Sequence, residues 1–369
     1  MSSKYPVVIY GASGYTGKLI AEYLREYRIP FIAAGRNKER VEEAMKLVPG
    51  IETADYKVVE VSHDLESLTK LFSDAEVVCN SVGPFEYYGD VVVEAAANGN
   101  THYLDTTGEQ NFMFRVREKF STQFEANGKV LAPSTAYMYT PLDICAHIVL
   151  QEPGIDTLDA ACVASGVPTY ASTQTIFSIF QPDNLYLENN ELVPWEKARG
   201  WEVNVPGKAM TQLSHPWGGG SLPVWFKDDT RVHSARQMTA FTNRAMYEKI
   251  IDLQKHYEEN IKDLADAERE KALSDIADNM QPGMPPRENK LINRTVDYVI
   301  GTGSGVTKTC VLNTTVPYQL TGVVQAAMAS YLLGNKPKQA GFVSACQAAG
   351  HEYVLGAIKN FLPVQIETY

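Results

Sequence analysis

The residues with the clearest chemical meaning are three glycines that follow the first apolar run of the chain. Gly11, Gly14 and Gly17 form a GxxGxxG pattern directly after Pro6–Tyr10. Such glycines permit a tight turn, close approach of the backbone to a pyrophosphate, and close packing of the next helix on the strand. The positive end of that helix would face the pyrophosphate. Because the pattern lies between a predicted strand and a predicted helix, it predicts a dinucleotide site; a glycine-rich structural turn is the alternative.

The residue type at the end of the second predicted strand distinguishes two dinucleotides. An NAD site usually has an acidic residue here for the ribose hydroxyls, whereas an arginine pairs with the 2′-phosphate of NADP. Arg36 stands at this place, 19 positions after Gly17. The sequence therefore predicts NADP (NADPH) as the cofactor, with an ordinary surface arginine as the alternative.

Further cofactor contacts are expected at the carboxyl ends of neighbouring strands, where open parallel sheets bind ligands. The turn at Gly83–Pro84 ends the fourth predicted strand and should pass under the nicotinamide ribose, unless it is only a turn. His63 is expected either to border the adenine or to be a surface residue. The residues predicted to contact the cofactor are Gly11, Ser13, Gly14, Tyr15, Thr16, Gly17, Arg36, Asn37, Ser62, Ser81, Val82, Gly83, Pro84 and Thr106.

The elements that must position these residues alternate along the first third of the chain. Short apolar runs alternate there with helical patterns, which is typical of βαβ units around a parallel sheet. The predicted strands cover 6–10, 31–34, 56–61, 75–82, 102–105 and 129–133, and the predicted helices cover 38–47, 65–72, 90–98 and 112–126.

After about residue 154 the pattern changes, and proline, glycine and aromatic residues become frequent. This predicts an α/β fold class: a Rossmann-type doubly wound parallel sheet with a second, mixed α/β (α+β) substrate domain. The predicted domains are 1–135 for NADP binding, 136–334 for substrate binding and dimerisation, and 335–369 as a C-terminal segment that returns to the first domain. Later predicted strands are 160–165, 173–180, 200–205, 295–300 and 307–313, and later predicted helices are 246–279 and 320–333.

Composition excludes several classes of function. The 369 residues carry a net charge of −11, which argues against a nucleic-acid binder. No apolar run reaches the roughly 20 residues that span a bilayer, and the N-terminus does not resemble a secretory signal. The five cysteines form no CxxC pair and the seven histidines form no HExxH pattern, so we expect reduced thiols, no metal site and a cytoplasmic protein.

Several stretches together carry a family resemblance. These are GASGYTG, AGR, CNSVGPFEYYGDVVVEAAANGNTHYLDTTGE and Tyr139–Asp143. They resemble the saccharopine dehydrogenase-like reductases, in particular the branch of the trans-acting enoyl reductases. The resemblance implies a Rossmann domain, an inserted α/β domain that carries the substrate surface, and a C-terminal segment packed on the first domain. Members of this family reduce C=N bonds or activated C=C bonds of lipid intermediates.

One departure from the family pattern bears on the substrate. Where the resemblance leads us to expect Gly-Phe-Asp-Ser-x-Pro-Ser-Asp, residues 136–143 read AYMYTPLD. The pocket should therefore be less polar here, which argues against an amino-acid substrate whose carboxylates need Arg or Lys partners. Trp195, Trp201, Trp217 and Trp225 favour a wide apolar cleft, or else they fill the core or a dimer interface.

Hydride transfer also requires one proton. We expect Tyr137 and Tyr139 near the nicotinamide edge, and His215 in a glycine-rich loop that acts as a lid, as candidate catalytic residues. Tyr87 or Tyr88 after the Gly-Pro turn are further candidates. A structural role for each, with solvent as the proton source, is the alternative.

The leading interpretation is an NADP-dependent reductase that acts on an activated C=C bond, such as an enone or enoyl group, of a hydrophobic small molecule. The alternatives are a C=N reductase or amino-acid dehydrogenase, and a non-catalytic NADP sensor or scaffold. We expect a homodimer with no nucleic-acid partner. Membrane association is compatible with the sequence but not required by it.

Overall fold

A computed structural model describes residues 4–166, 168–280 and 285–369, and the chain forms two compact units. The first unit comprises the residues up to Thr107, with Phe112–Thr140 and Tyr318–Leu362. The second unit comprises the remaining segments, Gly108–Asn111, Pro141–Pro317 and Pro363–Tyr369.

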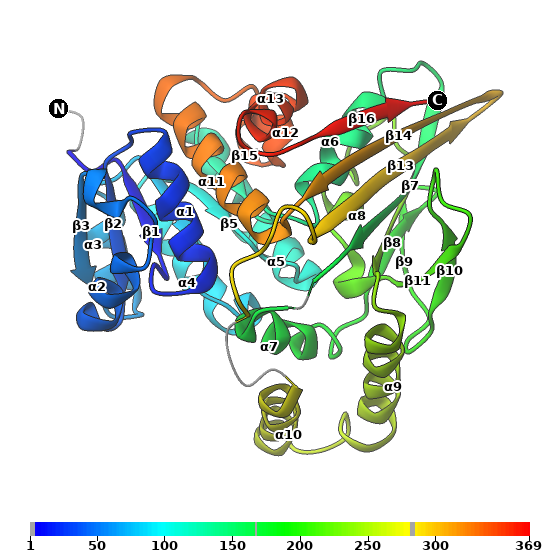
Figure 1. Ribbon diagram of the computed structural model, residues 1–369, viewed down its shortest axis with the longest axis horizontal. Helices are drawn as coiled ribbons and strands as arrows, with labels where there is room; N and C mark the ends of the chain where they lie inside the picture. The colour runs from blue at the N-terminus through cyan, green and yellow to red at the C-terminus, as the bar shows by residue number, and fades with distance from the viewer. Residues whose placement is uncertain (1–3, 167, 281–284) are drawn as a thin grey trace. The chain divides into compact units, whose positions relative to one another are not determined.

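The first unit contains a seven-stranded sheet in which every pair of neighbours is parallel. The strand order is β15-β6-β5-β4-β1-β2-β3, so the order reverses between β1 and β4 (Figure 1). This is the predicted Rossmann-type sheet, and that prediction is confirmed. Its strands are β1 (Val7–Tyr10), β2 (Phe31–Gly35), β3 (Tyr56–Glu60), β4 (Val77–Asn80), β5 (His102–Asp105), β6 (Val130–Ala132) and β15 (Gly341–Phe342).

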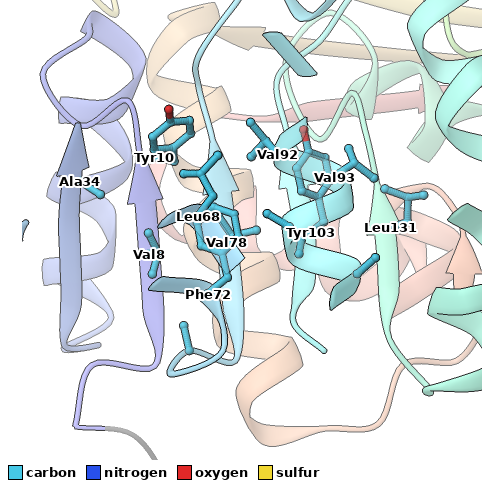
Figure 2. Packing of buried hydrophobic residues seen from close by; sticks show 14 of the residues in the cluster. Val8, Tyr10, Ala34, Leu68, Phe72, Val78, Val92, Val93, Tyr103 and Leu131 are labelled. Atoms are coloured by element: carbon cyan, nitrogen blue, oxygen red, sulfur yellow. The ribbon is translucent and has the colours of Figure 1, made fainter. Parts of the chain in front are cut away.

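The central strands consist mainly of apolar residues that are buried on both faces, with Asn80, His102 and Asp105 as buried polar exceptions. All residues of β1, β2, β4 and β5 are buried, as expected for a parallel sheet covered by helices. On one face, Leu68 and Phe72 pack against Val8 and Val78 in a single apolar cluster (Figure 2). The ring of Phe72 also meets that of Tyr10 edge-on, with 6.3 Å between centroids.

Helices α2 and α3 of the first unit begin at side-chain caps. The side chain of Asn37 accepts a hydrogen bond from the Arg40 N–H, and that of Asp64 accepts one from the Ser67 N–H. The helices are α1 (Tyr15–Glu26), α2 (Lys38–Lys46), α3 (Leu65–Phe72), α4 (Phe85–Asn98), α5 (Gln110–Ala126), α11 (Pro317–Gly334), α12 (Ala345–Ala349) and α13 (His351–Phe361), with a short turn η1 (Ile51–Thr53); the ends of α5 and α11 reach into segments of the second unit.

The second unit is built on a mixed sheet. Strands β12 and β7 are parallel, and the other neighbours are antiparallel. The order is β10-β11-β12-β7-β13-β14-β16, with β8 paired to β12 and to β9. Its strands are β7 (Ile155–Ala164), β8 (Leu185–Glu188), β9 (Glu191–Pro194), β10 (Trp201–Asn204), β11 (Thr211–His215), β12 (Ser234–Phe241), β13 (Arg294–Gly303), β14 (Val306–Thr315) and β16 (Gln365–Thr368). Its helical segments are α6 (Thr140–Val149), α7 (Tyr170–Ser178), η2 (Trp217–Gly219), α8 (Leu222–Trp225), α9 (Arg244–Asn260) and α10 (Asp266–Met280).

Two predicted elements differ from the structure. The strand predicted at 173–180 is wrong, because the segment is helix α7; the Thr169 hydroxyl accepts from the Ser172 N–H and begins the helix there. The long helix predicted at 246–279 is two helices, α9 and α10. The first ends where the Tyr257 carbonyl accepts from two successive N–H groups, those of Ile261 and Lys262.

The units also divide the chain differently from the predicted domains. Helix α11 lies almost wholly in the first unit, although residues 136–334 were predicted as one substrate domain. Strand β15 pairs with β6 of the first unit, whereas β16 pairs with β14 of the second. The C-terminal segment therefore contributes to both units.

Candidate functional site

The three glycines of the turn after β1 have different surroundings. Gly11 has φ +91°, and a Cβ there would lie 2.8 Å from Ser81 Oγ. A Cβ on Gly17 would lie 2.4 Å from the Gly11 carbonyl oxygen, so α1 can start only with a glycine at this place. A Cβ on Gly14 would meet only the Gly11 oxygen, at 3.2 Å. Packing within the protein thus requires Gly11 and Gly17, whereas Gly14 leaves open space beside the turn.

The start of α1 has the features of an anion site. Its N-cap is Gly14, no side chain caps the helix, and its first turn contains no acidic residue. The N–H groups of a first helical turn lack partners inside the helix and carry a partial positive charge. Ser13, Tyr15 and Thr16 are partly exposed around this helix start. The arrangement suits a pyrophosphate.

The end of β2 carries the predicted charge for a 2′-phosphate. Arg36 directly follows β2 and is exposed. The next residue behaves differently from its prediction: the Asn37 oxygen accepts from the Arg40 N–H at 2.7 Å and is thereby used as a helix cap. Glu60 at the end of β3 accepts from the Lys38 N–H at 2.9 Å. Arg36 is thus the residue here whose side chain suits a phosphate.

Three rings, those of Tyr10, His63 and Tyr88, lie together near Arg36. The His63 Nδ1 is hydrogen-bonded to the Tyr10 hydroxyl at 2.7 Å, and its ring meets that of Tyr88 edge-on at 5.5 Å. Burial and then the charge of Arg36 lower the pKa of His63. Burial raises the pKa of Tyr10 to about 12. Tyr88 therefore lies on the Arg36 side of the sheet edge, where the 2′-phosphate is expected and not the nicotinamide. This position does not favour Tyr88 as a proton donor. Ser62, next to His63 in the sequence, is exposed.

The loop after β4 supports the glycine turn from behind. The Ser81 hydroxyl lies 3.2 Å from the carbonyl oxygens of both Tyr10 and Gly11 and thereby holds the turn, and its contact with the cofactor stays a prediction. The buried Asn80 accepts from the Val82 N–H at 2.9 Å and donates to the Tyr103 hydroxyl at 3.0 Å. Val82, Gly83, Pro84 and Thr106 are partly exposed along the edge formed by β4 and β5.

A buried carboxyl group joins the ends of β5 and β6. Asp105 Oδ1 accepts from the N–H groups of Thr107 and Ser134, both at 2.9 Å. Its side chain is completely buried, and burial raises its pKa to about 7. Gln325 of α11 donates from Nε2 to the carbonyl oxygens of Asp105 and Thr135, each at 2.8 Å. The sequence signal for Asp105 was a lone carboxylate at the end of an apolar strand, whereas nothing local pointed to Gln325.

The segment with the candidate tyrosines is tied to the same edge. The Tyr137 N–H donates to Thr321 Oγ1 of α11 at 3.1 Å, and the Tyr139 N–H donates to the Ala136 carbonyl at 3.0 Å. Tyr139 is 5% exposed and Met138 is 9% exposed, while Tyr137 is half-buried. The first unit therefore brings both tyrosines beside the ends of β5 and β6, and their role as proton donors stays a prediction.

His215 does not have the environment predicted for it. It lies at the end of β11 and not in a lid loop, and it is 3% exposed. Its Nε2 donates to Gln254 Oε1 at 2.7 Å, and the same oxygen accepts from the Ala198 N–H. Burial lowers the pKa of His215 to about 4. A ring held neutral with its proton in a buried bond is unsuited to donate that proton, so the structure argues against His215 as the acid.

The tryptophans form separate packing groups within the second unit. Trp195 meets Trp201 edge-on at 5.1 Å, and Trp217 stacks on Tyr247 at 5.9 Å. Trp225 is 6% exposed. These contacts are typical of core residues. They favour the alternative that the tryptophans fill the core over the prediction that they line one wide apolar cleft.

Comparison with known proteins finds two family matches, one in each part of the chain. Residues 140–367 match a family of unknown function, DUF5938. The chain belongs to this family. Residues 7–130 match the saccharopine dehydrogenase NADP binding domain, so the glycine turn, α1 and Arg36 lie in an NADP-binding domain. The predicted resemblance and the predicted cofactor are confirmed.

Two relatives are similar to part of the chain. A lipid droplet localized protein of Caenorhabditis elegans is 31% identical over 150 residues, 38% of this DUF5938 chain and 35% of the relative. A putative trans-acting enoyl reductase of Mycobacterium tuberculosis is 29% identical over 187 residues, 48% of this chain and 44% of the relative. The chain thus spans less than half the length of these relatives.

A solved structure supports the fold of the whole chain. Apo saccharopine dehydrogenase (L-Glu forming) from Saccharomyces cerevisiae has a TM-score of 0.61 at 13% identity, over 98% of this chain and 99% of that one. In the part of the chain that the structure describes, no helix combines the length and the apolar character needed to cross a bilayer.

Proposed function

We propose that this chain is an NADP-dependent oxidoreductase that reduces an activated C=C bond, in an enone or enoyl group, of a hydrophobic small molecule. The observation that carries the proposal is the pairing of two features in the first unit. One is an uncapped α1 with Arg36 at the end of β2. The other is an apolar segment, residues 136–139, at the ends of β5 and β6.

The chain's own residues fit the cofactor in two places. The first turn of α1 would hold the pyrophosphate, since Gly14 leaves space there and no side chain caps the helix. Arg36 would pair with the 2′-phosphate. When bound, NADPH supplies the hydride. The side chains of Asp105 and Gln325 form hydrogen bonds to the backbone after β5 and β6, and these bonds hold both loops in place beside Thr106.

The side chains of the 136–139 segment favour an apolar substrate. Ala136, Met138 and Tyr139 are buried, and the segment contains no Arg or Lys that could pair with a substrate carboxylate. A saccharopine-like amino acid would need such partners. The enoyl reductase relative supports the choice of a C=C bond. Within this proposal Tyr137 or Tyr139 donates the proton, because both lie on the segment that Thr321 and Ala136 hold.

The test combines binding with turnover. Purified chain is titrated with NADPH by fluorescence, and NADPH oxidation is then followed with a hydrophobic enone, an enoyl thioester, and a 2-oxo acid with an amine. We expect NADPH binding and turnover of the enone or thioester. Tyr137→Phe should lower kcat by about 10²–10⁴-fold with NADPH binding unchanged, which is the usual contribution of a positioned acid. Tyr88→Phe is the matched control, since Tyr88 lies beside His63.

Each other outcome identifies an alternative. Turnover only of the 2-oxo acid with amine would mean a C=N reductase. Tight NADPH binding without turnover of any class would mean a sensor or scaffold. If Tyr137→Phe and Tyr139→Phe both keep full kcat, neither tyrosine is the donor.

The proposal includes a cytoplasmic homodimer. All five cysteines are buried thiols, which suits a reducing compartment. Light scattering of the purified chain tests the dimer, and a monomer at micromolar concentration would contradict it. Imaging of a tagged chain in its own cells tests the location.

A further inference from the structure

A short turn before β13 exposes two adjacent aliphatic side chains. Leu291 is 78% exposed and Ile292 is 70% exposed. Among the residues that the structure describes, these are the only two neighbouring large aliphatic residues in the exposed class. Single exposed apolar residues are normal on protein surfaces, but a pair at the tip of one turn calls for an explanation.

The backbone of this turn is held in one conformation. The Asn289 carbonyl accepts from the N–H groups of Ile292 and Asn293, and the Asn289 side chain accepts from the Leu291 N–H at 2.9 Å. Asn293 Oδ1 in turn accepts from the Asn289 N–H at 2.8 Å. The Ser165 hydroxyl donates to the Arg294 carbonyl at 2.8 Å, which joins the turn to the end of β7. Because hydrogen bonds hold the backbone of the turn on both sides, this backbone does not need to be ordered on binding.

The charges around the pair are positive in an acidic chain. Arg287, Lys290 and Arg294 are exposed, and Glu288 is the one acidic residue between Arg287 and Arg294. The whole chain has 44 acidic and 33 basic residues. An anionic surface would therefore attract this turn while it repels most of the molecule, which also sets the orientation of the bound protein.

We propose that residues 287–294 dock on an anionic lipid surface. Leu291 and Ile292 enter the interfacial region, while Arg287, Lys290 and Arg294 contact lipid phosphates. Neither part is sufficient by itself, because stable peripheral binding takes an apolar contact together with a basic one. A lipid surface fits this turn better than a second copy of the chain, because in a symmetric dimer the basic residues of the turn would face the same basic residues of the partner. The docking does not depend on the proposed reaction.

The experiment is vesicle co-sedimentation of the full chain. Phosphatidylcholine vesicles are compared with vesicles in which about a third of the lipid is phosphatidylglycerol, at low and at physiological salt. We expect binding to the anionic vesicles that weakens as salt rises. Leu291→Ser/Ile292→Ser should weaken it at least about tenfold, and Arg287→Gln/Lys290→Gln should remove most of the preference for anionic lipid.

Matched controls remove equivalent side chains elsewhere. Met210→Ser removes a side chain that is 77% exposed, and Lys57→Gln removes an exposed cation of the first unit; both should bind as the unaltered chain does. NADPH titration of every variant checks that it is folded. The proposal is overturned if the folded unaltered chain ignores anionic vesicles, or if the Leu291→Ser/Ile292→Ser variant binds them equally well. A dimer that this variant converts to a monomer would instead assign the turn to a second copy.

Discussion

Acid should destabilise the second unit through His215. The ring is 3% exposed, and burial lowers its pKa from the ordinary value of 6.5 to about 4. The folded chain therefore keeps the ring neutral. Above pH 6.5 the ring is neutral in the unfolded chain as well, so its protonation does not affect the free energy of unfolding there. As pH falls from 6.5 to about 4, the unfolded chain takes up a proton that the folded chain refuses, so stability is lost across this range. At about 1.4 kcal/mol per pH unit the loss from His215 alone is about 3 kcal/mol.

The assay is urea denaturation from pH 7.5 down to pH 4.5, followed by tryptophan fluorescence. All four tryptophans lie in the second unit, so this signal reports the unfolding of that unit. His215→Gln removes the titrating ring but keeps an N–H donor of similar reach toward Gln254 Oε1. We expect the free energy of unfolding of this variant to fall about 2–3 kcal/mol less than that of the unaltered chain over the same pH range. The lower absolute stability of the variant does not enter the comparison, because only the pH dependence is compared.

The control is His233→Gln, which removes a histidine of the same unit whose side chain is 52% exposed. It should keep the pH dependence of the unaltered chain. Equal pH dependence of the unaltered chain and the His215 variant would refute the reasoning. A loss of kcat in the His215 variant with unchanged pH dependence of stability would restore the residue as a catalytic acid.

Two further predictions concern the nucleotide site. Arg36→Ala should weaken NADPH binding by about 10–100-fold, because a charge-assisted bond to the 2′-phosphate is lost, and should leave NADH binding unchanged. Fluorescence titration measures both affinities, and Arg40→Ala on the exposed face of α2 is the control. An equal loss of affinity for both nucleotides would contradict the assignment. Gly17→Ala should cost about 2–4 kcal/mol of folding stability, because its Cβ would lie 2.4 Å from the Gly11 oxygen. Gly14→Ala should cost little stability but should weaken NADPH binding. Thermal unfolding and NADPH titration distinguish the two variants, and similar melting temperatures for both would contradict the packing argument.

The sequence predicted the first unit far better than the second. Strands β1 and β2 are continuous apolar runs, and β4 is apolar up to Asn80, so pattern and burial agree there. In the second unit, residues 173–180 have the β-branched and aromatic composition of a strand. The hydroxyl of Thr169 nevertheless starts a helix there, and Ile179 and Phe180 just beyond its end are buried in one cluster with Leu273 and Ala277 of α10. Packing against a helix about 100 residues away thus favours a helix in a segment whose local pattern is ambiguous.

The candidate site divides in the same way. The glycine turn and Arg36 were predictable because their spacing within one βαβ unit already determines where they lie. His215 was misplaced because the sequence around it, Ser214–Gly220, reads as a flexible loop. Its first residues are instead paired with β12, and Gln254 from α9 covers the ring.

What the sequence could not show is which remote residues hold the substrate end of the site. Gln325 reaches Asp105 across 220 positions, and Thr321 reaches Tyr137 across 184. Both belong to α11, which follows nearly the whole second unit in the chain but packs in the first. The position of the Tyr137 segment is therefore set only after the chain has passed through its second unit and returned. Helix α11 also reaches the start of α1, because the Tyr318 ring meets the Tyr15 ring edge-on at 5.3 Å. We therefore expect substitutions in α11 to affect the Tyr137 segment through Thr321 and the cofactor turn through Tyr318.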